Sequence, residues 1–190
     1  PIKIRVVDVL HCCIVFLPPN TAYYALSYVW GTEKERGFSC ELSNIHLLER
    51  PGGLTNVILP QTILDAMHAC QQLGQRFLWV DRYCIVQNDP NISVQLNQMA
   101  LIYHRATLTI VATGPGASYG LPGKSIARRT NGSMIKYNDN LELVHEIPNL
   151  DEYLWGTLWA HRGWTYQEQA ASSRLLYFTE YGVYYYSQEN

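Results

Sequence analysis

The chain has 190 residues, of which 47% are hydrophobic and 16% are charged, and its net charge is −2. This size and composition predict a single globular domain over residues 1–190, and the start at Pro1 leads us to expect a fragment of a longer protein. The small net charge does not provide the basic surface that binds nucleic acid or an anionic membrane. No apolar stretch approaches the roughly 20 residues that span a bilayer.

The cysteines and histidines show neither a disulfide framework nor a metal site. The five cysteines are an odd number without C-x-x-C spacing, so we expect buried free thiols in a reducing, cytoplasmic environment. The six histidines are scattered without the spacing of zinc ligands, and we therefore expect no metal.

The first part of the chain is expected to be mainly strand. Residues 2–9 alternate apolar and polar side chains, and residues 12–17 are expected to return as the hairpin partner before two prolines end the strand. Residues 24–30 form a short, almost wholly apolar run, which is typical of a strand covered on both faces. A few short strands are expected within residues 32–58.

Helices and strands alternate after this point. Pro60 suits the first turn of a helix whose apolar residues recur at helical spacing until Gly74 ends it. The elements predicted next are a buried strand over 77–80 that ends on Asp81, a helix capped by Ser93 that reaches Tyr103, and a buried strand over 108–112.

Residues 114–155 are expected to be a loop-rich insertion, because they are rich in Gly, Asn and Ser and have weak periodicity. A helix over 162–171 and strands over 175–178 and 183–186 follow. This alternation predicts an α/β fold with a mostly parallel central sheet, helices on both faces and added N-terminal strands. Ligands of such sheets bind beyond the carboxyl ends of the strands, so residues 27–31, residues 81–84 and Thr113 are expected to meet at one crevice.

Trp164 and Glu168 are four residues apart, so on a helix they share a face. A carboxyl beside a large aromatic ring is partly desolvated, so its pKa rises and it can hold or donate a proton to a substrate hydroxyl. Arg162 and Gln167 add hydrogen-bonding groups nearby. The alternative is that Glu168 forms an ion pair with Arg162 or Arg174 while Trp164 only packs.

Two residues near the end of the second buried strand also have alternatives. Asp81 can bind a substrate hydroxyl, such as that of a ribose, or it can cap the following turn. Cys84, with His104 or His161 as its base, would suit a cysteine hydrolase, but its apolar neighbours favour a buried thiol.

Residues 112–125 follow a strand and end in Gly-Lys-Ser, as a phosphate-binding loop does. However, Ser118 stands where that motif needs its first glycine, Pro122 stiffens the loop, and no amphipathic helix follows. The glycines of this stretch are therefore expected to serve a turn.

Four short segments each join an apolar run to polar or aromatic residues that a core does not need. They are Tyr23-Tyr-Ala-Leu-Ser-Tyr-Val-Trp-Gly31, Arg76-Phe-Leu-Trp-Val-Asp-Arg-Tyr-Cys-Ile-Val-Gln87, Met99-Ala-Leu-Ile-Tyr-His-Arg-Ala106 and Arg162-Gly-Trp-Thr-Tyr-Gln-Glu168. In this order they resemble the HET (heterokaryon incompatibility) domain of filamentous fungi, a cell-death module. The resemblance covers the chain from about Ile2 to Ser187.

HET domains are distantly similar to TIR domains, and two of these segments carry that similarity. Leu26-Ser-Tyr-Val-Trp-Gly31 is similar to a Leu-Ser-Phe-Arg-Gly-like segment of the first TIR strand, with Val29-Trp30 in place of the arginine. Trp164-Thr-Tyr-Gln-Glu168 has the Trp-to-Glu spacing of the TIR helix that carries the catalytic glutamate. The resemblance implies a TIR/flavodoxin-like fold.

TIR enzymes cleave NAD at the bond between nicotinamide and ribose. The resemblance therefore implies that Glu168 is the catalytic acid residue and contacts the ribose hydroxyls. It implies a substrate site made of Ser27, Tyr28, Trp30, Gly31, Asp81, Arg162, Trp164 and Gln167. NAD would be the substrate, and no cofactor is expected.

The resemblance also implies self-association and upstream sensor domains or proteins as partners. The alternative function is a non-catalytic signalling module that triggers cell death by assembly alone. Trp30, Tyr28 and the tyrosine-rich strand 184–186 could then form the interface.

Overall fold

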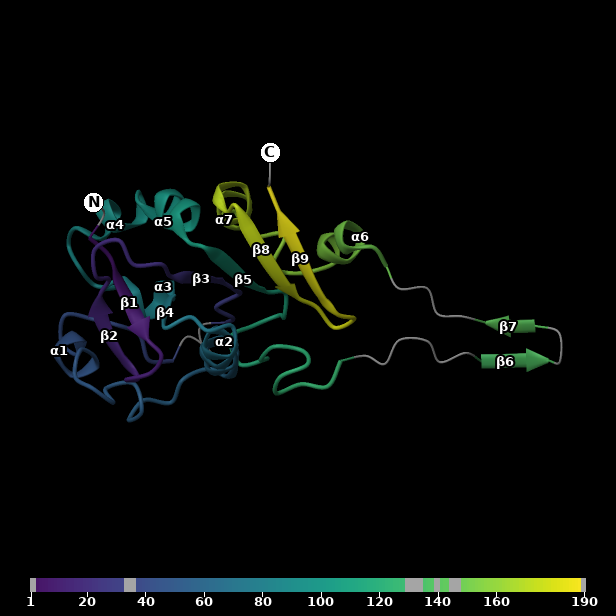
Figure 1. The fold of residues 1–190 in the computed structure, drawn as a ribbon, viewed down its shortest axis with the longest axis horizontal. Helices are drawn as coiled ribbons and strands as arrows, with labels where there is room; N and C mark the ends of the chain where they lie inside the picture. The colour runs from purple at the N-terminus through teal and green to yellow at the C-terminus, as the bar shows by residue number, and fades with distance from the viewer. Residues whose placement is uncertain (1–2, 33–36, 129–134, 139–140, 144–147, 189–190) are drawn as a thin grey trace.

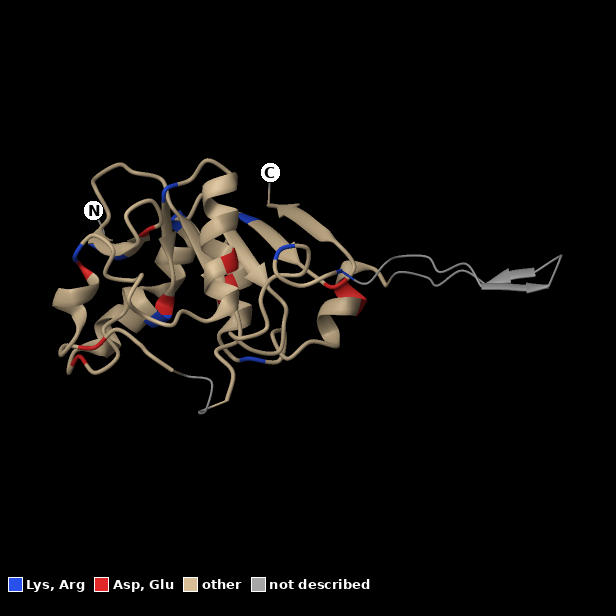
Figure 2. Cartoon of the chain, turned by 90° about the horizontal axis from the view of Figure 1, so that it is seen from below, with Lys and Arg blue, Asp and Glu red and all other residues tan. Residues whose placement is uncertain are grey.

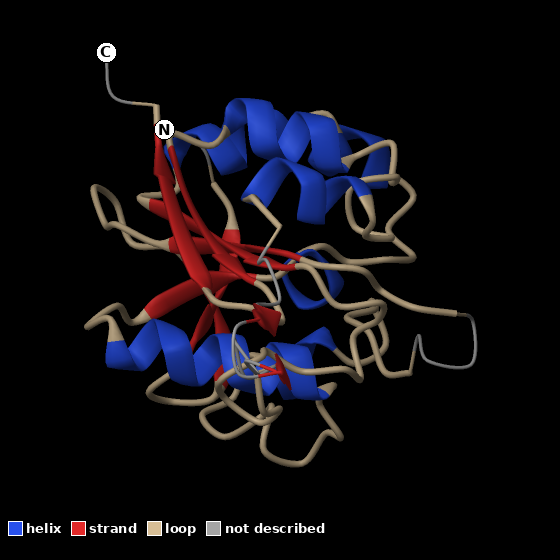
Figure 3. Ribbon diagram, turned by 90° about the vertical axis from the view of Figure 1, so that its right-hand side faces the viewer, coloured by secondary structure: helices blue, strands red, loops and turns tan. Residues whose placement is uncertain are grey.

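The computed structural model describes residues 3–32, 37–128, 135–138, 141–143 and 148–188. A seven-stranded sheet lies at its centre, in the order β2-β1-β4-β3-β5-β8-β9. Its strands are β1 (Arg5–Asp8), β2 (Cys13–Phe16), β3 (Tyr24–Ser27), β4 (Phe77–Trp79), β5 (Leu108–Ala112), β8 (Arg174–Phe178) and β9 (Val183–Ser187). Helices cover both faces of this sheet (Figure 3).

The four strands at the centre of the sheet are parallel, and the outer strands are antiparallel. β3 pairs in parallel with β4 and β5, and β5 pairs in parallel with β8. β1 pairs antiparallel with both β2 and β4, and β9 pairs antiparallel with β8. The predicted α/β fold with N-terminal strands is confirmed. The sheet as a whole is mixed rather than mostly parallel, because the hairpins β1-β2 and β8-β9 can only return antiparallel and β1 also runs antiparallel to β4.

The central strands are buried because helices pack on both of their faces. Every residue of β4 and β5 is buried, as the apolar runs in the sequence predicted. Tyr103 donates a hydrogen bond from its hydroxyl to the carbonyl of Leu26 at 3.1 Å. Its ring also meets that of Trp79 edge-on, with the ring centres 5.4 Å apart. These contacts fix a helix over the strands that lead to the candidate site.

Seven helices are formed by the described residues (Figure 1). They are α1 (Ile45–Leu48), α2 (Gln61–Gln72), α3 (Asp81–Cys84), α4 (Ile92–Leu96), α5 (Met99–Arg105), α6 (Leu150–Trp155) and α7 (Thr165–Ala171). α2 agrees with the predicted helix after Pro60, and Gly74 ends it with a left-handed φ of 75°. None of these helices combines the length and apolar content that a membrane crossing requires.

Three helix and strand predictions were wrong in detail. Residues 37–58 contain α1 and turns in place of the expected strands. The single helix predicted from Ser93 is two helices, α4 and α5, and Ser93 lies inside α4 rather than at its cap. α7 begins at Thr165 rather than at residue 162, in keeping with the low helix propensity of Gly163.

The glycine-rich segment after β5 folds back on α2. The buried carboxylate of Asp65 accepts hydrogen bonds from the Leu121 amide at 2.7 Å and from the Ser125 hydroxyl at 2.5 Å. Thr62 Oγ1 accepts one from the Gly120 amide at 2.9 Å, and Gly120 has a φ of 91°. The glycines therefore serve a turn, as predicted, and these amides are bonded to α2 rather than free to hold a phosphate.

Beyond this turn the described residues form an antiparallel strand pair, β6 (Ile135–Asn138) and β7 (Leu141–Leu143), and then α6. The insertion over residues 114–155 remains a prediction. Lys and Arg are interspersed with Asp and Glu along the described chain, and no region of one charge stands out (Figure 2).

Candidate active site

A cavity of about 380 Å³ is lined by side chains from the loop after β3, from α3 and the segment after it, from α4 and α5, and from the start of α7. The lining residues are Trp30, Gly31, Asp81, Ile85, Gln87, Leu96, Met99, Arg162, Trp164 and Glu168. The cavity therefore lies at the carboxyl edge of the parallel strands, where sheets of this kind bind ligands. Thr113, which was expected at the same crevice, does not line it; its hydroxyl is bonded to the carbonyl of Phe178 at 2.8 Å.

The carboxyl group of Glu168 is buried, with 2% of the residue exposed. Its Oε2 accepts a hydrogen bond from the hydroxyl of Ser27, the last residue of β3. Ser27 in turn accepts a hydrogen bond from the indole nitrogen of Trp159 at 2.7 Å. Burial raises the pKa of Glu168, and the charge of Asp81 adds to this, while the Ser27 hydrogen bond and the charge of Arg162 oppose it. Glu168 thus keeps its proton to a higher pH than an exposed glutamate.

Arg162 links the turn before α7 to the loop after β3. Its Nη1 donates to the backbone carbonyl of Tyr28, and its Nη2 lies 4.0 Å from Oε1 of Glu168. This second contact is at the outer limit of an ion pair, and both side chains still line the cavity. The expected alternative of a Glu168 ion pair is therefore present in a loose form with Arg162, while Arg174 is exposed on β8.

Asp81 contributes a second carboxyl group to the cavity. Its Oδ2 accepts a hydrogen bond from the indole nitrogen of Trp30 at 2.7 Å, and its Oδ1 accepts one from the Arg82 amide at 2.7 Å. Burial raises the pKa of Asp81, although these two hydrogen bonds and the charge of Arg162 lower it in part. Asp81 thus faces the cavity and bonds the neighbouring amide, but it does not cap α3, whose N-cap residue is Val80 and has no side-chain cap hydrogen bond.

Arg82 packs against Trp30. It is fully buried, and its Nη2 donates a hydrogen bond to the Trp30 carbonyl at 3.1 Å. Its guanidinium carbon lies 4.7 Å from the centre of the Trp30 ring and 5.9 Å from that of Tyr28. A cation against an aromatic face favours this stacked arrangement. Arg82 therefore fixes Trp30 in two ways, by the hydrogen bond to its carbonyl and by packing against its ring.

All the residues that line this cavity, from Trp30 to Glu168, lie within a segment that matches a known protein family. A family model described as heterokaryon incompatibility protein (HET) matches residues 23–168. The chain belongs to the HET family. A similar protein is heterokaryon incompatibility protein 6, OR allele, of Neurospora crassa, which is 34% identical over 119 residues. That match covers 57% of this chain and 17% of the relative, so this HET domain corresponds to a small part of the relative's length. No solved structure matches it.

The HET domain brings most of the predicted site residues together. Those that line the cavity are Trp30, Gly31, Asp81, Arg162, Trp164 and Glu168. Ser27 and Tyr28 lie behind it, buried, and Gln167 is half-buried and is not among the lining residues. Trp164 caps α7 and its carbonyl accepts the Glu168 amide at 3.0 Å, so the two residues are one turn apart, as their spacing predicted.

Two residues of this site were missed from the sequence. Trp159 is buried and bonded to Ser27, but it lies outside any predicted helix or strand, so no periodicity pointed to it. Arg82 follows Asp81, and a charged residue there gives no sign that it will be fully buried. The one available signal was that Trp159 stands close in sequence to the Arg162–Glu168 segment.

The cysteine-hydrolase alternative does not fit the HET domain. Cys84 is buried, and burial raises the pKa of its thiol well above the ordinary value. Its sulfur accepts a hydrogen bond from the Val80 amide at 3.3 Å. His161 is exposed and its Nε2 is bonded to the carbonyl of Trp155 at 2.9 Å. A neutral, buried thiol of this kind is structural. In the described part of the chain, His, Cys, Asp and Glu also form no group of three that could hold a metal ion.

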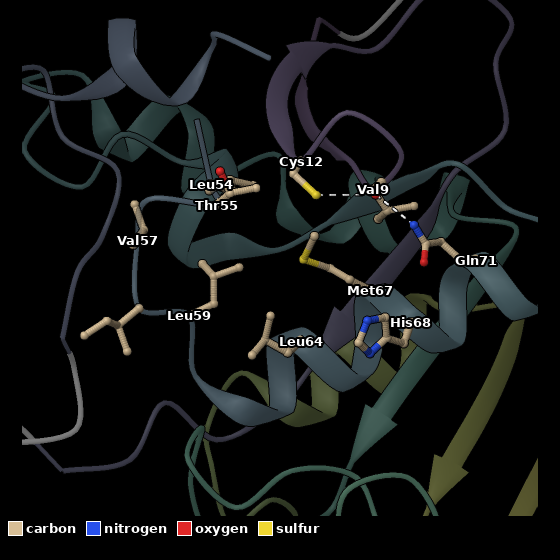
Figure 4. Close-up of a pocket in the computed structure, with 11 residues that line it drawn as sticks. Val9, Cys12, Leu54, Thr55, Val57, Leu59, Leu64, Met67, His68 and Gln71 are labelled. Atoms are coloured by element: carbon tan, nitrogen blue, oxygen red, sulfur yellow. Dashed lines mark hydrogen bonds between the residues drawn. The ribbon is translucent and has the colours of Figure 1, made fainter. Parts of the chain in front are cut away.

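A second cavity, of about 330 Å³, lies between the turn after β1, the segment before α2 and α2 itself (Figure 4). Its walls are mainly apolar, from Val9, Leu54, Val57, Ile58, Leu59, Leu64 and Met67. Gln71 and Cys12 also line it, but both already donate to the carbonyl of Val9, at 2.9 Å and 3.8 Å. No carboxyl group is among the residues that line this cavity, unlike the cavity of Glu168 and Asp81.

Proposed function

We propose that this HET domain is a cell-death effector that cleaves NAD at the bond between nicotinamide and ribose, with Glu168 as its catalytic acid residue. The observation that carries the proposal is the buried carboxyl of Glu168, which has a raised pKa and lines a cavity with Asp81, Trp30 and Arg162. Carboxyl groups with perturbed pKa values inside a cavity are typical of sites that handle protons.

The order of the parallel strands supports a likeness to TIR and flavodoxin-like sheets. Numbered along the chain, the parallel strands β3, β4, β5 and β8 lie across the sheet in the order 2-1-3-4. Flavodoxin-like sheets share this order and bind their ligands where it reverses, next to the first strand. Ser27 ends that strand, and Asp81 follows its neighbour, so the candidate site occupies the expected place.

In the proposed reaction the bond between C1′ of the ribose and the nicotinamide nitrogen breaks. Its electron pair stays on the nitrogen and neutralises the pyridinium charge. The reaction uses the ionised form of Glu168, which the raised pKa makes a more basic acceptor than an exposed carboxylate. This carboxylate accepts a hydrogen bond from a ribose hydroxyl and, with Asp81, stabilises the positive charge that develops on the ribose. Trp30 forms the aromatic wall for the departing ring. Water then adds to C1′ and releases one proton, which leaves nicotinamide and ADP-ribose as products.

The biological part of the proposal follows from the family. The Neurospora crassa relative is named for heterokaryon incompatibility, and we extend that role to this chain, together with the cell death that the HET resemblance implies. Cell death would result from loss of NAD in the cytoplasm. The five cysteines are free thiols, as a reducing compartment favours. Self-association and upstream sensor domains or proteins belong to the same proposal.

A second candidate function is a non-catalytic module that signals by assembly. Tyr185 and Tyr186 favour it, because they are 59% and 49% exposed on the edge strand β9. Tyrosine is enriched at the centres of protein interfaces, and an edge strand can accept another chain. Tyr28 cannot contribute to such an interface, since it is buried beneath the site.

The experiment that tests the first candidate follows nicotinamide release from NAD by the domain at concentrations that allow self-association. We expect the wild type to release nicotinamide and Glu168→Gln to be at least about a hundredfold slower. The matched control is Glu49→Gln, which removes an exposed carboxyl that does not line the cavity, and it should keep the wild-type rate. Circular dichroism establishes that each variant is folded.

If the wild type releases no nicotinamide at any concentration, the assembly candidate replaces the enzymatic one. Tyr185→Ala with Tyr186→Ala should then abolish self-association measured by light scattering. The enzymatic candidate would also fail if Glu168→Gln kept full activity.

A further inference from the structure

The hydroxyl of Ser27 lies between the indole N–H of Trp159, which can only donate a hydrogen bond, and the carboxyl of Glu168, which can gain or lose a proton. The indole nitrogen of Trp159, 2.7 Å from Ser27 Oγ, has a proton and no lone pair to offer. Ser27 must therefore accept from Trp159. Its own proton then needs an acceptor, because Ser27 is 1% exposed and an unpaired buried hydroxyl is costly. Oε2 of Glu168 is that acceptor.

We propose that Trp159 and Ser27 form a one-way hydrogen-bond chain that keeps Oε2 of Glu168 as an acceptor and reserves Oε1 for the titrating proton. Oε1 lies on the side of Arg162, 4.0 Å from its Nη2, and Arg162 lines the cavity. The chain therefore directs the reactive oxygen toward the substrate. This inference deepens the proposed function and rests on it for the identity of the substrate hydroxyl that meets Oε1.

The donor at the start of the chain is held rigidly. The ring of Trp159 meets that of Tyr177 at 90°, with the centres 5.8 Å apart. The hydroxyl of Thr165, in the first turn of α7, donates to the carbonyl of Trp159 at 2.6 Å. Trp159 is 1% exposed. The indole proton thus has a fixed direction, which is what a positioning group requires.

The acceptor at the other end is also fixed. Ser27 lies in the parallel ladder, opposite Val111 of β5, and Glu168 lies on α7, whose first turn is bonded to Trp159. Neither Ser27 nor Trp159 is among the residues that line the cavity. They are therefore positioning residues, which act on the substrate only through Glu168.

The direction of the Ser27 hydrogen bond can be tested by the sign of a pKa shift. The probe is the titration of the Glu168 side-chain carboxyl, followed by carbon-13 NMR with Glu168→Gln to assign the signal. If Ser27 donates, it stabilises the ionised form, so Ser27→Ala should raise the titration midpoint by about one to two pH units. If Glu168 instead donated to Ser27, the same substitution would lower the midpoint, and the proposal would be wrong.

Trp159→Phe tests the first link, because it keeps an aromatic ring and removes the N–H donor. A cooperative chain predicts a rise in the midpoint of roughly half a unit. The effect should vanish in the Ser27→Ala background, since Trp159 acts through Ser27. Equal shifts in both backgrounds would show that Trp159 acts through burial alone, which overturns the chain. Trp155→Phe, at a 75% exposed tryptophan nearby, is the matched control and should not move the midpoint.

The test remains decisive if one variant does not fold or if NAD is not the substrate. Ser27→Cys replaces the hydroxyl with a weaker donor and should shift the midpoint upward by less than Ser27→Ala does. The titrations use no NAD, so a failure of nicotinamide release leaves the hydrogen-bond chain standing. A reversed sign would contradict the chain and leave the proposed function to its own experiment.

Discussion

Asp8 and Glu168 are both buried carboxyl groups with 2% of the residue exposed, yet their surroundings move their pKa values in opposite directions. Burial alone would raise the pKa of Asp8, but hydrogen bonds from Arg76 and His11 outweigh it and lower the pKa to about 2. Arg76 reaches both oxygens of Asp8, at 2.6 to 3.1 Å, and His11 contributes a ring and a backbone nitrogen. Glu168 has one hydroxyl donor and an arginine at 4.0 Å.

The difference shows that burial does not by itself define a functional carboxyl. The number of hydrogen-bond donors around a buried carboxyl decides whether it stays ionised. Asp8 is held ionised at the end of β1, where it closes the turn to β2, and it lines neither of the two cavities described above. Glu168 is left short of donors beside a cavity that a substrate could enter. Asp8 is thus expected to stabilise the fold, and Glu168 to serve the site at some cost to stability.

The largest effect expected on stability comes from Asp8→Ala. It removes the carboxylate that accepts hydrogen bonds from Arg76 and His11. These two side chains are 45% and 57% exposed and can be solvated, so the free energy of unfolding should fall by about 2 kcal/mol. Urea denaturation measures this. The control Glu49→Ala breaks an ion pair in which Arg5 is 23% and Glu49 is 40% exposed. It should lower the free energy of unfolding by less than about 1 kcal/mol. If the free energy of unfolding fell equally in the two variants, the contacts of Asp8 with Arg76 and His11 would contribute no more than an exposed ion pair.

Acid should weaken the fold through Asp8 in a defined pH range. The folded pKa of about 2 lies below the ordinary 3.8, so the unfolded chain binds this proton first as the pH falls. The stabilisation is complete above pH 3.8 and is lost as the pH falls toward 2, by about 2 kcal/mol. Urea midpoints measured from pH 5 to pH 2 test this. Asp8→Asn should not show this loss of stability in acid. If its urea midpoint depended on pH as strongly as that of the wild type, the prediction would be contradicted.

The smallest effect is expected at Glu168 and has the opposite sign. Its folded pKa is raised above 4.5, so its favourable contribution is complete below pH 4.5 and is lost as the pH rises through the folded pKa. Glu168→Gln should therefore match the wild type near pH 4 and be more stable than the wild type near pH 7. Denaturation at the two pH values measures the gain. A loss at pH 7 as large as that of Asp8→Ala would make Glu168 a structural residue like Asp8.

The sequence was sufficient for the parts of the fold and site that depend on local patterns. Apolar runs located β3, β4 and β5, and the four-residue spacing of Trp164 and Glu168 placed them one turn apart. Polar residues directly after strands marked Asp81 as a neighbour of residues 27–31, because parallel strands end at the same edge, and Trp30 does contact Asp81.

Contacts between distant segments could not be predicted in this way. Trp159 and Ser27 are 132 residues apart, and neither the indole nor the hydroxyl has a pattern that names its partner. Arg82 is buried against two aromatic rings that belong to another loop. The division of one predicted helix into α4 and α5 depends on packing rather than on periodicity, which continues across the break.

The most direct test is a carbon-13 NMR titration of the side-chain carboxyls in the wild-type domain. We predict that Asp8 titrates with a midpoint of about 2 and that Glu168 titrates above its ordinary value of 4.5 in the same sample. A Glu168 midpoint at or below 4.5 would mean that its surroundings hold the charge as those of Asp8 do, and the carboxyl would no longer qualify as the acid residue of this site.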